Sequence, residues 1–206
     1  AQMLGTDVDK VAFDGSYVFV DEDEEEEKKV SLEQVALKGT FFNNIELQVV
    51  KQHSSPLSPP PFMVGMAEVE IDKETGELEL IDYVAVVDCG TVVNPSLARV
   101  QTEGGLAQGI GMAMYEDVIY NAKGKNYSNS FMQYKIPSRL DVGEIRVEFE
   151  SSYEPTGPFG AKSIGEIVIN TPSPAIASAV SHAVGVKVRE LPITAEKVFW
   201  GMQEED

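Results

Sequence analysis

One carboxylate stands where acid–base chemistry is common. Glu166 ends the segment Gly160-Ala161-Lys162-Ser163-Ile164-Gly165-Glu166, in an irregular loop (residues 151–166) that leads into a predicted helix. A carboxylate in the first turn of a helix gains about 0.3–1 kcal/mol from the helix dipole. Alternatively, a glutamate on a loop whose glycines permit close backbone approach acts as a general base beside a ligand. The residue alone does not decide between these two interpretations.

Two other motifs in the chain are incomplete. Gly160-Ala161-Lys162-Ser163 resembles the end of a phosphate-binding loop, but alanine stands where glycine must precede the lysine, and no strand leads in. Gly109-Ile110-Gly111 lacks the third glycine of a dinucleotide fingerprint, because Met114 takes that position. The single cysteine, Cys89, excludes a multi-cysteine zinc or iron–sulfur site, and the two histidines are far apart. We therefore assign no metal ligand to this chain.

The elements that must position Glu166 follow from hydrophobic periodicity and turn chemistry. Strands are predicted over residues 11–13, 17–20, 66–71, 78–87, 118–120, 127–134, 145–149 and 186–189. Helices are predicted over residues 32–39, 95–115, 173–185 and 194–200. Ser31 and Gln34 have capping-box spacing at the start of the first helix, and Ser173 and Thr194 are the predicted N-caps of the last two. The pattern predicts a mixed α/β (α+β) fold.

The segment 95–115 has an unusual number of glycines for a helix. Its predicted apolar face consists of Leu97, Val100, Leu106, Ile110 and Met114. Its interior also contains Gly104, Gly105, Gly109 and Gly111. Each glycine costs about 1 kcal/mol relative to alanine in a helix interior, so something must approach this backbone closely. Either a ligand or a tightly packed neighbouring element would explain it.

Charge is concentrated near the N-terminus. The chain has 34 acidic and 16 basic residues, a formal net charge of −18, and residues 21–27 are seven consecutive carboxylates. Such a run is typical of a solvated loop, with a cation or basic-partner site as the alternative. The acidic balance disfavours nucleic acids and anionic membranes, and no apolar run approaches the ~20 residues of a spanning helix. We expect a cytoplasmic protein with a small-molecule substrate.

Composition also suggests three regions. Residues 1–40 form a small acidic peripheral lobe, residues 41–65 form a Pro-rich connection, and residues 66–206 form the larger domain. The run Ser54–Pro61 contains four prolines, which fix φ and lack the N–H that a central strand needs. The domain assignment therefore places the connection around this run.

Several ordered segments together resemble a known family. They are Ala67–Asp72, Thr75-Gly76, Val87–Gly90, Val93–Pro95, Gln101–Gly111, Tyr134–Pro137 and Gly160–Glu166. Their order is similar to that in the C-terminal part of the molybdopterin-binding subunit of the xanthine dehydrogenase family, the molybdenum hydroxylases. The resemblance covers residues 60–200 closely, whereas residues 1–60 are similar in layout only.

The resemblance implies specific roles. At the Glu166 position the family has its active-site base, which takes the proton of a Mo–OH group before the oxygen attacks an electrophilic carbon. Gln108 and Gly109 match cofactor-contacting positions, and the backbone of Ala161, Lys162, Ser163, Ile164 and Gly165 matches the stretch that lines the molybdenum–molybdopterin cofactor. Burial against that cofactor would raise the pKa of the Glu166 carboxyl.

The resemblance also implies what this chain lacks. The upstream cofactor-binding loops and the substrate-clamping residues of the family have no counterpart in these 206 residues. FAD and iron–sulfur clusters belong to other domains or subunits. We therefore expect a fragment or split subunit that is inactive alone and needs the rest of the molybdopterin-binding subunit.

The two residues after the expected base indicate a substrate class. Ile167-Val168 follow Glu166, where many relatives have two prolines, and this variant resembles enzymes that hydroxylate purines or related N-heterocycles. An aldehyde oxidoreductase of the same chemistry and a non-catalytic interaction module remain the alternatives.

Overall fold

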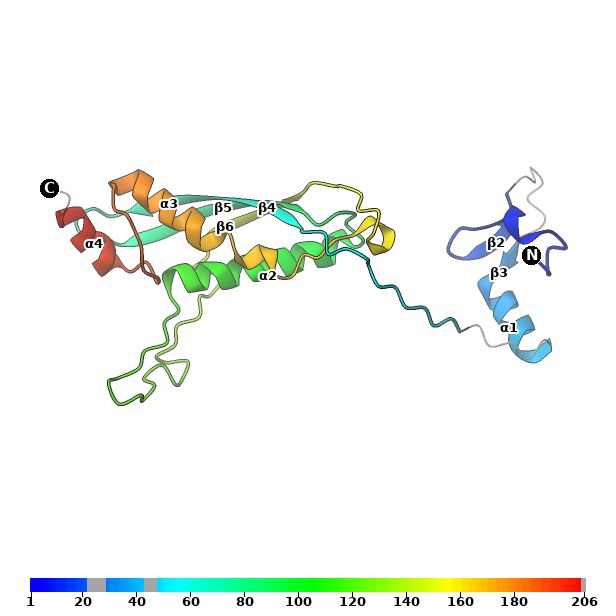
Figure 1. Ribbon diagram of the computed structural model, residues 1–206, viewed down its shortest axis with the longest axis horizontal. Coiled ribbons are helices and arrows are strands. Elements are labelled where there is room, and N and C mark those ends of the chain that lie inside the picture. The colour runs from blue at the N-terminus through cyan, green and yellow to red at the C-terminus, as the bar shows by residue number, and fades with distance from the viewer. Residues whose placement is uncertain (22–28, 43–47, 205–206) are drawn as a thin grey trace. The chain divides into compact units, whose positions relative to one another are not determined.

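The chain folds into two compact units. The computed structural model describes residues 1–21, 29–42 and 48–204, and it divides into residues 1–53 and 54–206 (Figure 1). This division falls inside the predicted connection, residues 41–65. The run of carboxylates at 21–27 lies outside the described residues, apart from Asp21.

The first unit is a small antiparallel sheet followed by one helix. Its elements are η1 (Val8–Lys10), β1 (Val11–Phe13), β2 (Tyr17–Val20), β3 (Val30–Ser31) and α1 (Leu32–Phe42). The predicted hairpin is confirmed, since β1 pairs with β2 antiparallel and the Asp14 carboxylate accepts hydrogen bonds from two backbone N–H groups in its turn. The expectation that α1 ends at Gly39 was wrong: Gly39 is buried inside the helix, which continues to Phe42.

The capping box at the start of α1 is confirmed atom by atom. The Gln34 N–H donates to Ser31 Oγ over 3.2 Å, and the Ser31 N–H donates to Gln34 Oε1 over 3.0 Å. Two backbone N–H groups that a helix start leaves without partners are therefore satisfied by two side chains that are three positions apart.

The second unit has a three-stranded sheet with the order β4-β5-β6. The strands are β4 (Phe62–Ile71), β5 (Leu78–Asp88) and β6 (Glu144–Phe149), with β5 antiparallel to β4 and parallel to β6. The predicted hairpin is confirmed, although β4 begins four residues earlier than expected. The long connection from β5 to β6 contains α2 (Pro95–Met114), as a parallel pair requires a crossover.

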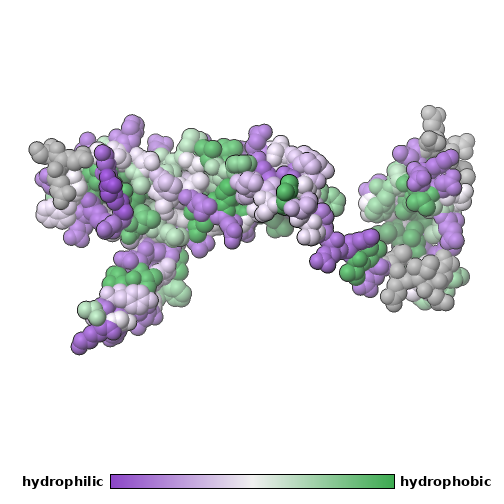
Figure 2. Space-filling model, in the orientation of Figure 1, coloured by the Kyte–Doolittle hydropathy of each residue, from purple (hydrophilic) through white to green (hydrophobic). Residues whose placement is uncertain are grey.

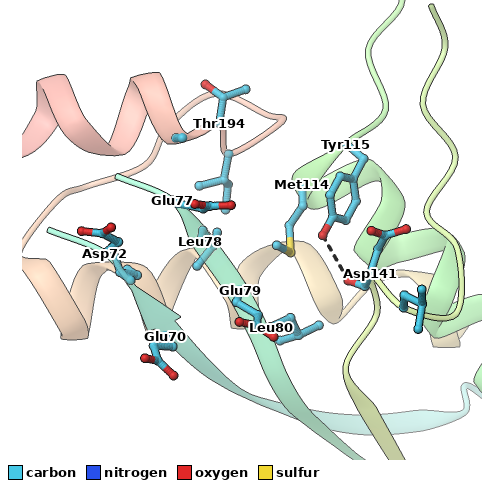
Figure 3. Close-up of a pocket in the computed structure, with 14 residues that line it drawn as sticks. Glu70, Asp72, Glu77, Leu78, Glu79, Leu80, Met114, Tyr115, Asp141 and Thr194 are labelled. Atoms are coloured by element: carbon cyan, nitrogen blue, oxygen red, sulfur yellow. Dashed lines mark hydrogen bonds between the residues drawn. The ribbon is translucent and has the colours of Figure 1, made fainter. Parts of the chain in front are cut away.

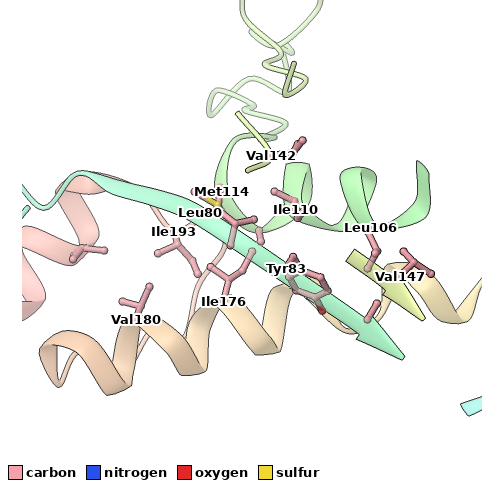
Figure 4. Close-up of a cluster of buried hydrophobic side chains, with 13 residues drawn as sticks. Leu80, Tyr83, Leu106, Ile110, Met114, Val142, Val147, Ile176, Val180 and Ile193 are labelled. Carbon is pink, nitrogen blue, oxygen red and sulfur yellow. The ribbon is translucent and has the colours of Figure 1, made fainter. Parts of the chain in front are cut away.

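Helices pack against one face of this sheet. They are α2, α3 (Pro172–Val184) and α4 (Ala195–Glu204), with the single turns η2 (Pro158–Gly160) and η3 (Ile167–Ile169) between β6 and α3. Helix α3 packs on β4, and α2 contacts both α3 and η3. Their shared core includes Leu80, Tyr83, Leu106, Ile110, Ile176 and Val180 (Figure 4). The Tyr83 hydroxyl donates to Thr171 Oγ1 over 2.8 Å, so this buried phenol is satisfied.

Three predicted strands were wrong. Residues 118–120 and 127–134 form no strand, apart from one isolated bridge between Tyr120 and Asn126. They belong to an arm, residues 116–141, that projects from the end of α2 where no sheet is available to pair with it (Figures 1 and 2). Residues 186–189 are also not a strand, because Val186 packs against Gly201 of α4 instead.

Helix boundaries and faces were predicted in part. Thr194 is confirmed as a cap, since its Oγ1 accepts from the Lys197 N–H over 3.3 Å, although α4 extends past Trp200 to Glu204. Helix α3 begins at Pro172, so Ser173 lies within the helix and is not its N-cap.

On α2 the predicted apolar face is only half correct. Leu106, Ile110 and Met114 are buried, but Leu97 and Val100 are exposed, because the first turns of the helix extend beyond the core. No helix among the described residues is long and apolar enough to cross a membrane.

Candidate active site

The predicted loop is fixed to the end of β5 by backbone hydrogen bonds. Gly90 and Ala161 form an isolated antiparallel bridge. The Lys162 N–H donates to the Cys89 carbonyl over 2.7 Å, and the Thr91 N–H donates to the Gly160 carbonyl over 2.8 Å. Gly90 has a φ of +69°, a conformation that glycine adopts without steric cost. The loop is therefore positioned by the strand, although it has little regular structure of its own.

An ion pair strengthens the same junction. Lys162 Nζ donates to Asp88 Oδ2 over 2.7 Å, and the exposed fractions of the two side chains are 6% for the lysine and 20% for the aspartate. Asp88 Oδ1 also accepts from the Ser152 hydroxyl over 2.6 Å and from the Gly90 N–H over 2.9 Å. Desolvation alone would raise the pKa of the Asp88 carboxyl, but these three donors outweigh it and lower the pKa to about 2.

After the loop, the chain runs along α2 in close contact. Gly165 faces Gln101, since a methyl group on Gly165 would lie 3.5 Å from Gln101 Nε2. Two further contacts follow, from Val168 to Gly105 and from the Ile169 carbonyl and Pro172 to Gly109. Each α2 glycine in these contacts leaves no room for a side chain. Tight packing by η3 and the start of α3 therefore explains Gly105 and Gly109.

Gly104 is different from its neighbours. A methyl group on Gly104 would meet no atom within 4 Å, so this part of α2 faces open space. Gln101, Gly104 and Gln108 lie on roughly one face of α2. Gln101 and Gln108 are seven residues apart, which is close to two full helical turns, and Gly104 lies about one turn from each of them. Both glutamines are exposed, and their backbone positions are about 10 Å apart along the helix. The open face of α2 thus runs beside the segment that contains Glu166.

A cavity of about 500 Å³ lies between the loop and the start of α2. It is lined by Cys89, Thr91, Val92, Val93, Asn94, Leu97, Ala98, Gln101, Ala161, Lys162, Ile164 and Gly165. The backbone N–H groups of residues 163–166 have no hydrogen-bond acceptor among the described residues. A row of free donors beside a cavity fits a ligand rich in acceptor oxygens or nitrogens.

The structure brings together most of the predicted site residues. Ala161, Lys162, Ile164 and Gly165 line the cavity, while Ser163 lies between them and is exposed. The ammonium group of Lys162 is bound to Asp88, so the lysine contributes its backbone to the cavity wall. Gln108 and Gly109 lie farther along α2 and are not among the residues that line this cavity.

Sequence reasoning missed Gln101 and Asp88. Gln101 lies in the same resemblance segment as Gln108, seven residues earlier, and this spacing could have indicated a second amide on one helix face. Asp88 stands at the end of a strongly apolar strand, two residues before Gly90. A carboxylate at the end of such a strand is often held in a fixed position by nearby hydrogen-bond donors. Its partner Lys162 could not be found from sequence, because the two are 74 residues apart.

Glu166 directly follows the cavity residue Gly165 and is exposed. Its backbone is helical, but its side chain makes no cap hydrogen bond to η3. Only this three-residue turn follows directly, since α3 begins at Pro172. The helix-dipole interpretation required a helix that starts at Glu166, and the structure therefore gives it little support.

A larger cavity, about 830 Å³, lies at the opposite end of the sheet (Figure 3). Five carboxylates line it, from Glu70, Asp72, Glu77, Glu79 and Asp141. Leu78 in this cavity and Asp88 are ten residues apart on β5, which corresponds to about 33 Å. Because of this distance, the acidic cavity is separate from the candidate active site. Among the described residues, no group of three or more potential metal-ligating side chains could hold a metal ion.

Comparison with known proteins identifies the family. A family model described as a molybdopterin cofactor-binding domain matches residues 1–143. The chain belongs to this family, the xanthine dehydrogenase-like molybdenum hydroxylases. The match includes residues 1–60, where the sequence resembled the family in layout only, so that expectation was too narrow. It also contains Gln101 and Gln108.

Individual relatives agree with this assignment. The chain is 38% identical over 148 residues to the probable hypoxanthine oxidase XdhD of Escherichia coli, covering 70% of this chain and 15% of XdhD. It is 37% identical over 142 residues to subunit gamma of the 6-hydroxypseudooxynicotine dehydrogenase complex of Paenarthrobacter nicotinovorans, covering 68% of this chain and 18% of that subunit. The chain therefore spans less than one fifth of the length of these two relatives.

Solved structures show the same fold. Cu,Mo-CO dehydrogenase aligns with a TM-score of 0.83 and 23% identity, over 99% of this chain and 26% of that chain. Quinoline 2-oxidoreductase from Pseudomonas putida 86 aligns with a TM-score of 0.79 and 27% identity, over 98% of this chain and 27% of that chain. The mixed α/β fold is thus that of part of a molybdenum-binding subunit.

The residues at the candidate site fit part of a molybdopterin cofactor. The free N–H groups of residues 163–166 and the exposed Gln101 amide are donors to a ring system with many acceptors. The described donors come from one loop segment and one helix, residues 163–166 and Gln101. Because the chain belongs to a molybdopterin cofactor-binding family, the group that these donors would hold is the molybdenum–molybdopterin cofactor.

Proposed function

We propose that this chain is part of a molybdenum hydroxylase that hydroxylates an electrophilic carbon of a purine or related N-heterocycle, with Glu166 as the general base. The observation that carries the proposal is the position of Glu166: it directly follows the cavity-lining residues and lies beside the open face of α2. When bound, the molybdenum cofactor supplies the oxygen and accepts the electrons of the reaction.

The residues of this chain have two tasks in the proposal. The backbone N–H groups of residues 163–165 and the Gln101 amide hold the cofactor by donating hydrogen bonds, and Gln108 offers a further contact along α2. The Glu166 carboxylate accepts the proton that the hydroxylating oxygen loses before it attacks carbon.

The choice of substrate class rests on relatives of this chain. XdhD is named as a probable hypoxanthine oxidase, and one solved neighbour is a quinoline 2-oxidoreductase. Both named substrates are N-heterocycles with an electron-poor carbon next to nitrogen. Aldehyde oxidoreductases are also relatives, at 36% identity for the one from Megalodesulfovibrio gigas. A panel of purines, quinolines and aldehydes distinguishes the two classes, and turnover of aldehydes alone would refute the N-heterocycle assignment.

Substitution of the base tests the mechanism. In the complete, cofactor-loaded enzyme, Glu166→Gln keeps the shape of the side chain but cannot accept a proton. We expect kcat to fall by about 10²- to 10⁴-fold with the molybdenum content unchanged, because this is the usual contribution of a general base. Glu196→Gln, the same change at an exposed glutamate in the first turn of α4, is the control and should retain most activity.

Near-normal turnover of the Glu166→Gln enzyme would refute the role of Glu166 as general base and favour the alternative, a non-catalytic interaction module.

The same proposal predicts that the 206-residue chain, purified alone, contains no stoichiometric molybdenum and has no turnover. Since the donors found among the described residues come from the 163–166 segment and α2 alone, stoichiometric metal in that sample would contradict the proposal that other parts of the enzyme complete the site.

A further inference from the structure

We propose that the Asp88–Lys162 ion pair is a positioning device that holds the 161–166 segment against the end of β5 and so places Glu166 beside α2. The two side chains are the positioning residues, and neither has to touch substrate. This proposal rests on the proposed role of Glu166, but its first test measures loop motion and does not depend on catalysis.

The pair connects segments that are far apart in sequence. Asp88 ends β5, Ser152 lies just after β6, and Lys162 belongs to the loop. The Lys162 ammonium also lies 5.1 Å from the centre of the Phe62 ring, at the start of β4. One lysine therefore connects the loop to both β4 and β5, at the end of the sheet where the candidate cavity opens.

Burial makes this pair different from the other ion pair on β5. The side chain of Lys162 is 6% exposed, and its partner accepts two further hydrogen bonds. Arg146 on β6 pairs with Asp82 on the same sheet, but 57% of the Arg146 side chain is exposed. Loss of a buried partner leaves an uncompensated charge, whereas loss of an exposed partner is replaced by water. We therefore expect the first pair to fix its segment and the second to have little effect.

The position of the pair relative to Glu166 explains its effect on the reaction. Beyond Lys162, the backbone N–H groups of residues 163–166 donate to no described residue, and the Glu166 carbonyl accepts from the Ile169 N–H of η3, the turn that contacts α2. Glu166 is thus held between two anchors, the junction at Lys162 on one side and the packing of Val168 on Gly105 on the other. Removal of the first anchor allows the base to move while the second anchor and the core remain.

Hydrogen exchange of the 206-residue chain tests the anchor directly. Lys162→Met should accelerate exchange of the hydrogen-bonded backbone amides at this junction, those of Thr91, Ala161 and Lys162, by about tenfold or more, with exchange in β5 and α2 changed much less. Arg146→Met is the matched control and should leave exchange within about twofold in both places. Unchanged exchange in the loop of Lys162→Met, or equal acceleration across the whole second unit, would overturn the proposal.

Turnover of the complete, cofactor-loaded enzyme tests the consequence. We expect Lys162→Met to lower kcat per bound molybdenum by about 10- to 100-fold with a smaller change in KM, because misplacement of a catalytic group by about 1 Å has this effect. Lys162→Arg, which keeps the charge, should recover part of the loss. If Glu166→Gln lowers kcat but Lys162→Met does not, the positioning role of the ion pair is refuted, whereas the role of Glu166 as general base is not.

A double variant separates positioning from stability. Asp88→Asn combined with Lys162→Met removes both charges, so global stability should recover relative to Lys162→Met alone. The loop would still lack its anchor, and we expect fast loop exchange and low kcat to persist. Recovery of kcat in parallel with stability would show that the pair acts only through stability and would overturn the proposal.

Discussion

Two irregular segments of the second unit differ in what holds them in place. The loop at residues 151–166 is bound to β5 by backbone hydrogen bonds and by a buried ion pair. The arm at residues 116–141 projects from the end of α2 (Figure 2). In this arm, Phe131 and Leu140 are 82% and 94% exposed. The irregular backbone of the loop is therefore held in place by long-range contacts, whereas that of the arm is not packed on the core. A segment without helix or strand can thus still have a fixed position.

Most of the arm's hydrogen bonds lie within the arm itself. The Tyr127 N–H donates to the Ile119 carbonyl over 2.8 Å, and Asn121 Oδ1 accepts from the Lys123 and Lys125 N–H groups over 2.9 Å each. These local bonds shape the tip without joining it to the sheet. By contrast, the Lys162–Asp88 bond joins residues 74 apart in the chain. Long-range bonds thus mark the segment that we assign to the active site.

The largest effect on stability is expected where the segment after the loop packs on α2. A methyl group on Gly109 would lie 2.6 Å from Pro172 Cγ and 2.9 Å from the Ile169 carbonyl oxygen. Gly109→Ala should therefore lower the free energy of unfolding by about 2 kcal/mol. Gly104→Ala, on the open face of the same helix, should raise it by about 1 kcal/mol, because alanine is the better helix former.

Urea denaturation of the 206-residue chain measures both changes. Changes in the free energy of unfolding with opposite signs, at two glycines only five positions apart, would distinguish the packed face of α2 from its open face. A Gly109→Ala protein as stable as wild type would contradict the close packing of η3 and α3 on this helix.

A smaller effect is expected at the ion pair, with a defined pH dependence. Asp88→Asn should cost about 1.5 kcal/mol of stability near neutral pH, at the lower end of the range for hydrogen bonds to a charged group. The pKa of the Asp88 carboxyl is lowered from its usual 3.8 to about 2 in the folded chain. Its stabilising contribution is therefore complete above about pH 4 and is lost as the pH falls through 2.

Denaturation at several pH values checks this expectation. The difference in stability between wild type and Asp88→Asn should shrink as the pH is lowered from 4 to 2. Arg146→Met, which breaks the exposed pair, should change stability by less than about 1 kcal/mol at any of these pH values. A constant difference for Asp88→Asn down to pH 2 would show that the charge of the carboxylate is not what stabilises the junction.

The smallest effects are expected in the arm. Phe131→Ser and Leu140→Ser should each change the free energy of unfolding by no more than about 0.5 kcal/mol, because both side chains are already exposed. Thermal denaturation of the 206-residue chain measures the change. A loss above about 1.5 kcal/mol for either variant would mean that the arm is packed in solution, and the contrast between the two segments would disappear.

Sequence patterns were sufficient for several locally determined features, although the predicted caps at Gly39 and Ser173 were wrong. The Ser31–Gln34 capping box, the β4–β5 hairpin and the start of α2 at Pro95 follow from spacing and turn chemistry, and all three are present. The strands expected at 118–120 and 127–134 failed because β-rich composition forms a strand only when a partner strand is within reach. No local signal shows that these residues leave the sheet.

The candidate site was predicted in its loop but not in its neighbours. Residues 160–166 have glycines and a terminal carboxylate, so the sequence alone indicates an irregular, functional segment. The contacts of Gln101 and Asp88 with the loop became visible only in three dimensions, because each residue meets the loop from an element more than 60 residues earlier. The functional assignment of Glu166 needed the family resemblance as well, since a single exposed glutamate carries no chemical signature.

A structure of the complete enzyme with its cofactor and an N-heterocyclic inhibitor would test the role of Glu166 without relying on kinetics. We expect residues 161–165 and Gln101 to contact the cofactor and the Glu166 carboxylate to lie within about 3 Å of the group that it deprotonates. A Glu166 side chain that faces bulk solvent, with the cofactor bound away from this loop, would refute Glu166 as the base.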